Sequence, residues 1–206
     1  EYSISRLLTQ RGYGITSQPQ KILLDSNAYF RLADNLYPLL DRTYGSSPGW
    51  KLCILGGTLH EYNYSVRLRS KFIWVENEKH IEDRQRGKIR LSEDQKTSIA
   101  GTKEFMRQTC RDEDLGCSPF DIECLAAAYE LHITLVTDDI DLVELANLYE
   151  QPVMSSMELM QKMLAEQCIT IDDVKSVVAM WTYDEDLPSH FHSEYVRLFG
   201  EEPEAF

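Results

Sequence analysis

Residues 133–146 read ITLVTDDIDLVELA, an apolar and β-branched run that leads directly into Asp138, Asp139 and Asp141. The first part has the length and composition of a buried β-strand, and the part after the aspartates has the apolar spacing of a helix. A strand that passes directly into a helix is the repeating unit of parallel α/β sheets. Three aspartates in four residues repel one another and contribute no apolar side chain to a hydrophobic core, so the turn between the two elements needs an explanation.

The pattern of a short apolar strand closed by polar or small residues occurs three more times. It appears in KILLDSN at 21–27, KLCILGG at 51–57 and QPVMS at 151–155. Segments with helical spacing separate these strands, and the strand-helix alternation predicts an α/β fold with one parallel β-sheet and right-handed crossovers. We expect helices on both faces of the sheet and additional helices at the C-terminal end.

Helix starts are marked by capping boxes, in which a hydroxyl residue is followed three positions later by an acid or amide. They occur at Ser92 with Gln95, Ser155 with Glu158 and, in a looser form, Thr170 with Asp173. At Ser118 the capping residue is followed by Pro119, which favours the first helical position and puts Asp121 in the first turn. The four methionines of one row recur at every third residue, at 154, 157, 160 and 163. We expect them to pack in the core, with a contact in a homodimer as the alternative.

These patterns divide the chain into three parts. Residues 1–20 form an N-terminal extension, residues 21–155 the α/β domain, and residues 156–206 a helical extension that packs on the same domain. Within the domain, residues 62–117 are expected to be helical and charged. A chain of 206 residues with 43% hydrophobic residues is long enough for a domain of this kind with a substantial core.

The charge of the chain is uneven. The formal net charge of −13 argues against a surface that binds nucleic acid through bulk electrostatics. Residues 62–111, however, hold 12 Lys and Arg against 7 Asp and Glu, so a basic arm is set on an acidic body. The alternative is an ordinary solvated helical face of mixed charge.

The sequence also bears on compartment and on thiol chemistry. It contains no run of roughly 18 apolar residues, and EYSISRLLTQ lacks the order of a secretory signal, so we expect a cytoplasmic protein without a membrane partner. Five cysteines without a C-x-x-C pair indicate reduced thiols, mostly buried, and neither a disulfide framework nor a zinc site.

Acidic residues stand where the predicted strands end. Asp25 closes the first strand, Glu61 follows the glycines that close the second, and Asp139 follows the third, while Asp121 begins the helix that leads into the third. Ligands of open parallel sheets bind beyond these carboxyl ends. Four converging carboxylates repel one another unless a cation neutralises them, and oxygen ligands alone favour Mg²⁺ or Mn²⁺. Three small polar neighbours are expected to orient them: Ser26, Asn27 and Thr137.

Each acid also has an ordinary structural role. Asp25 can cap the helix after its strand, Glu61 and Asp121 can complement helix dipoles, and Asp138 is expected to be a solvated neighbour. Other motifs are excluded: Gly12 and Gly14 precede the first strand, so they do not form a dinucleotide fingerprint, and no Walker A loop or G-x-S-x-G motif is present. A calcium loop fails as well, because Glu144 occupies the position that requires glycine.

At these residues the chain resembles a known family. LLDSNAYFRL, a glutamate on the helix after the second strand, and DIECLAAAYELHITLVTDDIDLVELA look like the PIN-domain nucleases, especially the VapC-type toxins of toxin-antitoxin systems. The resemblance covers roughly residues 21–155, and residues 62–117 and the C-terminal helices look longer than in compact toxins.

The resemblance implies a three-layer α/β/α fold and a metal-dependent ribonuclease blocked by a cognate antitoxin. By position in the motif, the catalytic acids are Asp25, Glu61, Asp121 and Asp139. Asp141 is then an auxiliary metal ligand, Thr137 the turn threonine, and Asn27 the small polar residue after the first acid.

The leading hypothesis is an endoribonuclease that uses Mg²⁺ or Mn²⁺ to hydrolyse RNA phosphodiester bonds. The basic arm would guide RNA to the site, with these candidate phosphate contacts: Arg67, Arg69, Arg84, Arg86, Lys88 and Arg90. A catalytically inactive PIN-like module that docks a partner protein is the alternative. A haloacid-dehalogenase-like phosphatase ranks last, because Asp25 is followed by Ser and Asn where that chemistry usually needs paired aspartates.

Overall fold

A computed structural model describes residues 18–203, so nearly all of the expected N-terminal extension lies outside the described residues. The sheet contains β1 (Gln20–Leu24), β2 (Trp50–Cys53), β3 (Thr134–Val136) and β4 (Val153–Met154). All neighbouring pairs are parallel and the strand order is β2-β1-β3-β4, which confirms the predicted α/β class. The four strands are the four that the sequence predicts.

The strand register explains why β1 is buried on both sides. Ile22 is paired with Leu52 on one neighbouring strand and with Thr134 on the other. Alternate residues of β1 point to opposite faces, so Ile22 and Leu24 join one core cluster while Leu23 joins a second one. A strand without a polar face reads as a continuous apolar run, as a central parallel strand must.

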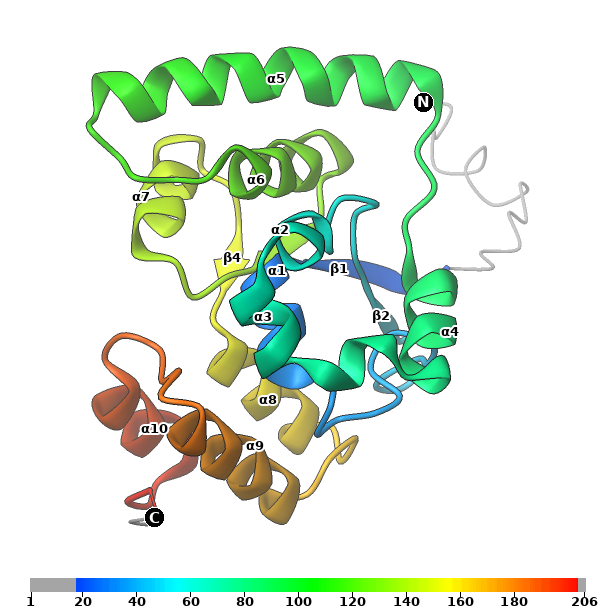
Figure 1. The fold of residues 1–206 in the computed structure, drawn as a ribbon, viewed down its shortest axis with the longest axis vertical. Coiled ribbons are helices and arrows are strands. Elements are labelled where there is room, and N and C mark those ends of the chain that lie inside the picture. Colours follow the sequence, from blue (N-terminus) through cyan, green and yellow to red (C-terminus); the bar gives the residue numbers. More distant parts are fainter. Residues whose placement is uncertain (1–17, 204–206) are drawn as a thin grey trace, which may run out of the picture.

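Helices cover both faces of the sheet, which makes three layers (Figure 1). Toward one end of the view lie α5 (Glu93–Asp112), α6 (Pro119–Leu131) and α7 (Ile140–Leu148), with α5 packed along α6. Toward the other lie α8 (Ser156–Ala165), α9 (Ile171–Tyr183) and α10 (Phe191–Phe199), and α1 (Ser26–Leu32) contacts α8 and α9. The C-terminal helices thus pack on the same domain.

Between β2 and α5 the chain forms short helices. These are α2 (His60–Tyr64), α3 (Val66–Lys71), the 3₁₀ helix η2 (Ile73–Glu76) and α4 (Glu78–Gly87). Residues 60–76 thus form three separate short helices, α2, α3 and η2. Ser65 has extended backbone and its side chain accepts a hydrogen bond from the Leu68 N–H, so it ends α2 and caps α3.

Local helix signals are borne out elsewhere. All four predicted capping positions, Ser92, Ser118, Ser155 and Thr170, form complete capping boxes. The methionines at 157, 160 and 163 are fully buried, which confirms their core role. All five cysteines are free thiols, and three of them are buried. Across residues 18–203, no helix combines the length and hydropathy needed to span a bilayer.

A buried carboxylate holds the connection between α1 and β2. Both oxygens of Asp83, on α4, accept backbone N–H groups from Leu39, Leu40 and Asp41 at distances of 2.8 to 3.3 Å. This carboxylate therefore supplies the hydrogen-bond acceptors that the backbone N–H groups of an irregular loop would otherwise lack.

Asp83→Ala should lower the free energy of unfolding by about 3 kcal/mol, because it leaves several buried N–H groups without an acceptor. Urea denaturation measures the change. Glu82→Ala, one residue away but exposed, is the matched control and should cost less than about 1 kcal/mol. Equal losses in the two variants would show that the loop does not depend on Asp83.

Candidate active site

Asp25 lies at the carboxyl end of the central strand β1 and is completely buried. Its Oδ1 accepts a hydrogen bond of 2.7 Å from the Ala28 N–H, so the residue caps α1, the role that the sequence offered as an alternative. Its Oδ2 is also buried but has no hydrogen-bond partner. Capping therefore uses one oxygen of the carboxylate and leaves the other, Oδ2, buried without a hydrogen-bond donor.

The pKa of Asp25 is raised to about 7, mainly because burial penalises the charged form. The neighbouring Thr137 hydroxyl and the hydrogen bond from the Ala28 N–H oppose this shift, and the charges of Asp138 and Asp121 add to it. Near neutral pH the carboxyl is consequently poised between its neutral and charged forms. A cation beside Oδ2 would favour the charged form.

Asp139 comes from the turn between β3 and α7. Its Oδ1 accepts a hydrogen bond from the Leu142 N–H and caps α7, while its own N–H donates to Thr137 Oγ1. Thr137 is buried next to Asp25, so one hydroxyl side chain is close to both acids. The predicted orienting role of Thr137 fits this position.

Asp121 links the remaining acids. It lies in the first turn of α6, and burial raises its pKa, as do the negative charges of Asp139 and Glu61. Asp25 in turn feels the charge of Asp121. Glu61 is exposed in the first turn of α2 and lines a hollow of about 440 Å³ together with Gly57 and Phe120. Each of the other three predicted acids thus lies within electrostatic reach of Asp121.

The convergence is loose and does not form a closed cage. Within residues 18–203, no three Asp, Glu, His or Cys side chains are grouped closely enough to hold a metal ion as they stand. Mg²⁺, however, usually keeps several waters and uses only one or two protein carboxylates. The buried, unpartnered Oδ2 of Asp25 fits such an ion, and so does a donor set made of oxygen.

Asp138 is not the solvated neighbour that the sequence predicted. Its side chain is only 3% exposed, and its Oδ2 forms an ion pair of 2.7 Å with Arg31 of α1. Ser156, at the start of α8, donates to it from the backbone N–H at 2.8 Å and from Oγ at 2.7 Å. Asp138 therefore clamps the turn that carries Thr137 and Asp139 to two helices.

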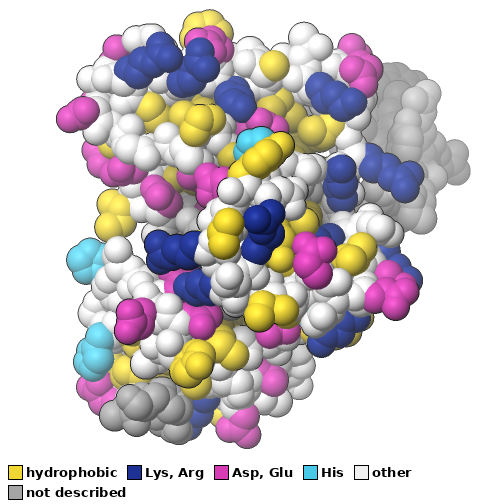
Figure 2. Space-filling model, viewed as in Figure 1, with side chains coloured by type: hydrophobic (Ala, Val, Ile, Leu, Met, Phe, Trp, Pro, Cys, Tyr) yellow, Lys and Arg dark blue, Asp and Glu magenta, His cyan; other side chains and the backbone are white. Residues whose placement is uncertain are grey.

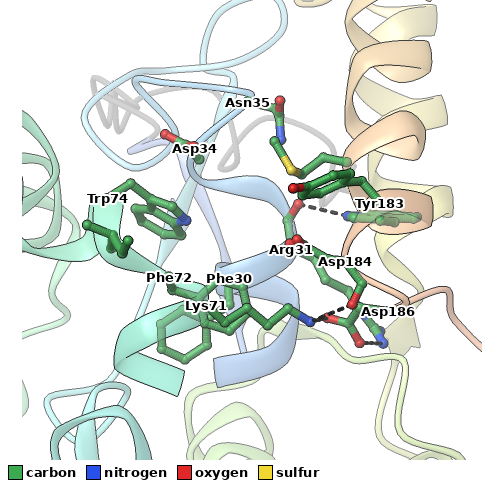
Figure 3. A pocket seen from close by; sticks show the side chains of 13 residues that line it. Phe30, Arg31, Asp34, Asn35, Lys71, Phe72, Trp74, Tyr183, Asp184 and Asp186 are labelled. Carbon is green, nitrogen blue, oxygen red and sulfur yellow. Dashed lines mark hydrogen bonds and ion pairs between the residues drawn. The ribbon is translucent and has the colours of Figure 1, made fainter. Parts of the chain in front are cut away.

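Arg31 extends this clamp to the C-terminal part of the chain. It also binds Asp186, after α9, at 3.0 Å, and Lys71 at the end of α3 binds the same carboxylate at 3.2 Å. Figure 3 shows Arg31 and Lys71 approaching Asp186 from different helices beside a hollow of about 300 Å³. The indole N–H of Trp181 donates to the Arg31 carbonyl at 2.9 Å. The C-terminal helices thereby support the turn at the site.

The other predicted residues around the site have separate positions. The Ser26 hydroxyl donates to the Thr58 carbonyl at 3.0 Å, which ties α1 to the turn after β2, whereas Asn27 is exposed. Asp141 accepts the Gly116 N–H at 2.8 Å and so anchors the loop before α6. The Thr58 hydroxyl donates to the Leu55 carbonyl at 2.9 Å and does not cap α2, whose N-cap residue is Leu59.

The predicted phosphate contacts do not form one arm. Arg84 is buried and donates to the Tyr29 hydroxyl and the Val75 carbonyl, so it is a structural residue and that prediction is wrong. Arg86 pairs with Asp41 and Glu82. The remaining four are exposed: Arg67, Arg69, Lys88 and Arg90. Figure 2 shows Lys and Arg scattered over this face among acidic and apolar side chains.

Comparison with known proteins gives only a weak likeness. No family model matches the chain, and no curated protein matches its sequence. Among solved structures, the chain is similar to FitAcB from Neisseria gonorrhoeae, with 13% identity, a TM-score of 0.41, and coverage of 66% of this chain and 97% of that one. At this TM-score the likeness assigns neither a family nor an activity, so function has to be argued from the residues.

Proposed function

We propose that the chain is an endoribonuclease of PIN type that depends on Mg²⁺ or Mn²⁺. The observation that carries the proposal is the buried Oδ2 of Asp25, which has no hydrogen-bond partner, at the carboxyl edge of the sheet. The charge of Asp121 acts on Asp25, and the charges of Asp139 and Glu61 act on Asp121. A buried, unpaired acid costs stability, and a fold that keeps one gains most when a cation binds there.

The residues would divide the work. Asp25 and Asp139, whose second oxygens are not used in capping, would hold the ion, with Glu61 and Asp121 completing its environment and Asp141 as an auxiliary ligand. A bound Mg²⁺ or Mn²⁺ supplies orientation of the phosphate, activation of water and stabilisation of the leaving oxygen. Thr137 keeps Asp25 and Asp139 in position through its hydroxyl.

Asp139→Asn tests this proposal. Asparagine is a good N-cap, so α7 should remain folded, but RNA cleavage should fall at least about 100-fold, a loss of roughly 3 kcal/mol of transition-state stabilisation. Cleavage of single-stranded RNA is measured with Mg²⁺ or Mn²⁺ and with a chelator. Asp94→Asn, at the exposed start of α5, is the matched control and should keep wild-type activity.

A narrower proposal concerns the role of the chain in the cell. We infer a cytoplasmic toxin whose cleavage of RNA is blocked by a cognate antitoxin protein. The resemblance of the motifs to VapC-type toxins supports it. Expression of the wild-type chain should arrest growth of a bacterial host, whereas expression of Asp139→Asn should not.

A binding module without catalysis is the second candidate. The absence, within residues 18–203, of a side-chain group already arranged for a metal favours it. Calorimetry with Mn²⁺ separates the two candidates, because the nuclease must bind the ion and the module need not. If the folded chain neither binds Mn²⁺ nor cleaves RNA, the nuclease is excluded and the binding module is the remaining candidate.

A further inference from the structure

Another hollow, of about 460 Å³, lies beside the edge strand β2, and its lining is strongly basic. It is formed by residues of β1, β2 and the end of α4, and these side chains line it with positive charge: Lys21, Lys51, Arg86, Lys88 and Arg90. Asp41 is the acid in the lining. So dense a cluster of cations is unexpected in a chain with a net charge of −13.

The strand register places two of these lysines side by side. Lys21 of β1 is paired with Lys51 of β2, and both side chains are exposed. They share a sheet face with Leu23 and Cys53, which are buried in the core cluster that α5 and α6 help to form. Those helices therefore leave the amino end of this face open. Neighbouring strands are only about 4.8 Å apart, so the two ammonium groups repel each other.

The charge of the hollow is largely uncompensated. Arg86 pairs with Asp41 and Glu82. By contrast, four residues have no acidic ion-pair partner among residues 18–203: Lys21, Lys51, Lys88 and Arg90. Within the described residues 18–203, four cations without an acidic partner thus lie in one depression, and an anionic ligand would relieve their mutual repulsion.

The basic hollow adjoins a hollow beside the turn that follows β2. Lys88 and Gln85 line both it and a neighbouring hollow of about 310 Å³, which reaches Gly56 and Thr58. A Cβ atom at Gly56 would come within 2.9 Å of the Lys88 Cε, so the glycine leaves room for this lysine. The next residue, Gly57, lines the hollow that contains Glu61. The first two hollows therefore share lining residues, and the consecutive glycines Gly56 and Gly57 line the second hollow and the one with Glu61.

We propose that the basic hollow binds backbone phosphates of the RNA strand that extends away from the acidic site, with Lys21, Lys51 and Arg90 as the main contacts. The identity of the strand rests on the proposed nuclease function, whereas the anion site rests on the hollow itself. A recessed track fits a flexible single strand, and a flat bilayer surface reaches such a track less well. Binding releases counterions that are condensed on the RNA phosphates, so the affinity of such contacts depends on the salt concentration.

The test compares two charge-matched variants of the full chain. The hollow variant combines Lys21→Gln, Lys51→Gln and Arg90→Gln. The α5 variant combines three substitutions on α5: Lys96→Gln, Arg107→Gln and Arg111→Gln. Glutamine keeps much of each apolar stem while removing the charge. Fluorescence anisotropy with a labelled single-stranded oligouridylate, in chelator to prevent cleavage, measures affinity at several salt concentrations.

The hollow variant should bind the oligouridylate about tenfold or more weakly, and the magnitude of its salt slope should fall by about 2, while the α5 variant changes much less. Equal affinity of the hollow variant and the wild type would overturn the proposal. So would failure of the wild type to bind the oligouridylate. A larger loss of binding to vesicles of phosphatidylcholine and phosphatidylserine than to the oligouridylate would also overturn it, in favour of a membrane surface.

The same variants separate this proposal from the nuclease proposal. If the chain cleaves RNA and the hollow variant binds the oligouridylate normally, the proposal for the basic hollow is wrong and the nuclease proposal is retained. If the chain does not cleave RNA but the hollow variant loses binding, the anion site stands without the nuclease.

Discussion

Asp25→Asn should reduce RNA cleavage at least about 100-fold, as large a functional effect as that of Asp139→Asn. Asparagine can still accept the Ala28 N–H and cap α1. The variant removes the negative charge that a cation would need at the buried Oδ2. Cleavage of single-stranded RNA at saturating Mg²⁺ measures the loss.

The same substitution should stabilise the metal-free chain at high pH. The pKa of Asp25 is raised from 3.8 to about 7, so between these values the folded state binds more protons than the unfolded state. The chain is therefore least destabilised by Asp25 below about pH 4, and the free energy of unfolding falls as the pH rises to about 7. Above that the penalty is roughly 4 kcal/mol, and Asp25→Asn should remove most of it.

Urea denaturation at pH 5 and pH 8, without metal and with Mg²⁺, measures both parts of this prediction. Mg²⁺ should stabilise the wild type at pH 8 but leave Asp25→Asn unchanged, because ligands that bind the folded state stabilise it by mass action. Lower stability of the variant at pH 8 would mean that Asp25 serves the fold alone.

Arg31→Met should cause the second large effect, a loss of about 3 to 5 kcal/mol in the free energy of unfolding. The substitution leaves the buried Asp138 without its cation and also removes the ion pair with Asp186. Because Asp138 lies in the turn with Thr137 and Asp139, RNA cleavage should fall about 10-fold to 100-fold at temperatures where the variant is folded. Arg31 is a positioning residue, since it acts through Asp138.

A double-mutant cycle isolates this contact. Arg31→Met combined with Asp138→Asn should cost at least about 1 kcal/mol less than the sum of the single variants, because each single variant already breaks the ion pair. Arg197→Met is the control: its exposed ion pairs with Glu158 and Glu194 should contribute less than about 1 kcal/mol. Strict additivity of Arg31 and Asp138 would contradict the clamp.

The sequence predicts the parts of this fold that local chemistry determines. All four strands and the capping boxes were predictable because an apolar run, a capping hydroxyl or Pro119 acts on its immediate neighbours. The position of Asp25 and Asp139 at the same edge of the sheet was predictable from a general property of parallel sheets, since these two residues follow adjacent strands.

Contacts between distant segments could not be predicted in the same way. Arg31 and Asp138 are 107 residues apart, and nothing in ITLVTDDIDLVELA shows that the first aspartate has a buried cation. Arg84 looks like the other basic residues of its helix, and only packing against Tyr29 shows that it is structural. Lys21 and Lys51 look like solvated strand residues until their register is known.

Diffraction from a crystal of the full chain soaked in Mn²⁺ at pH 8 tests the metal site most directly. We predict an anomalous peak within coordination distance of Asp25 Oδ2, shared with Asp139, and no peak there in Asp25→Asn. The anomalous signal locates the ion without any assumption about substrate. Saturating Mn²⁺ without a peak at Asp25, in a chain whose fold agrees with the one described, would contradict the account.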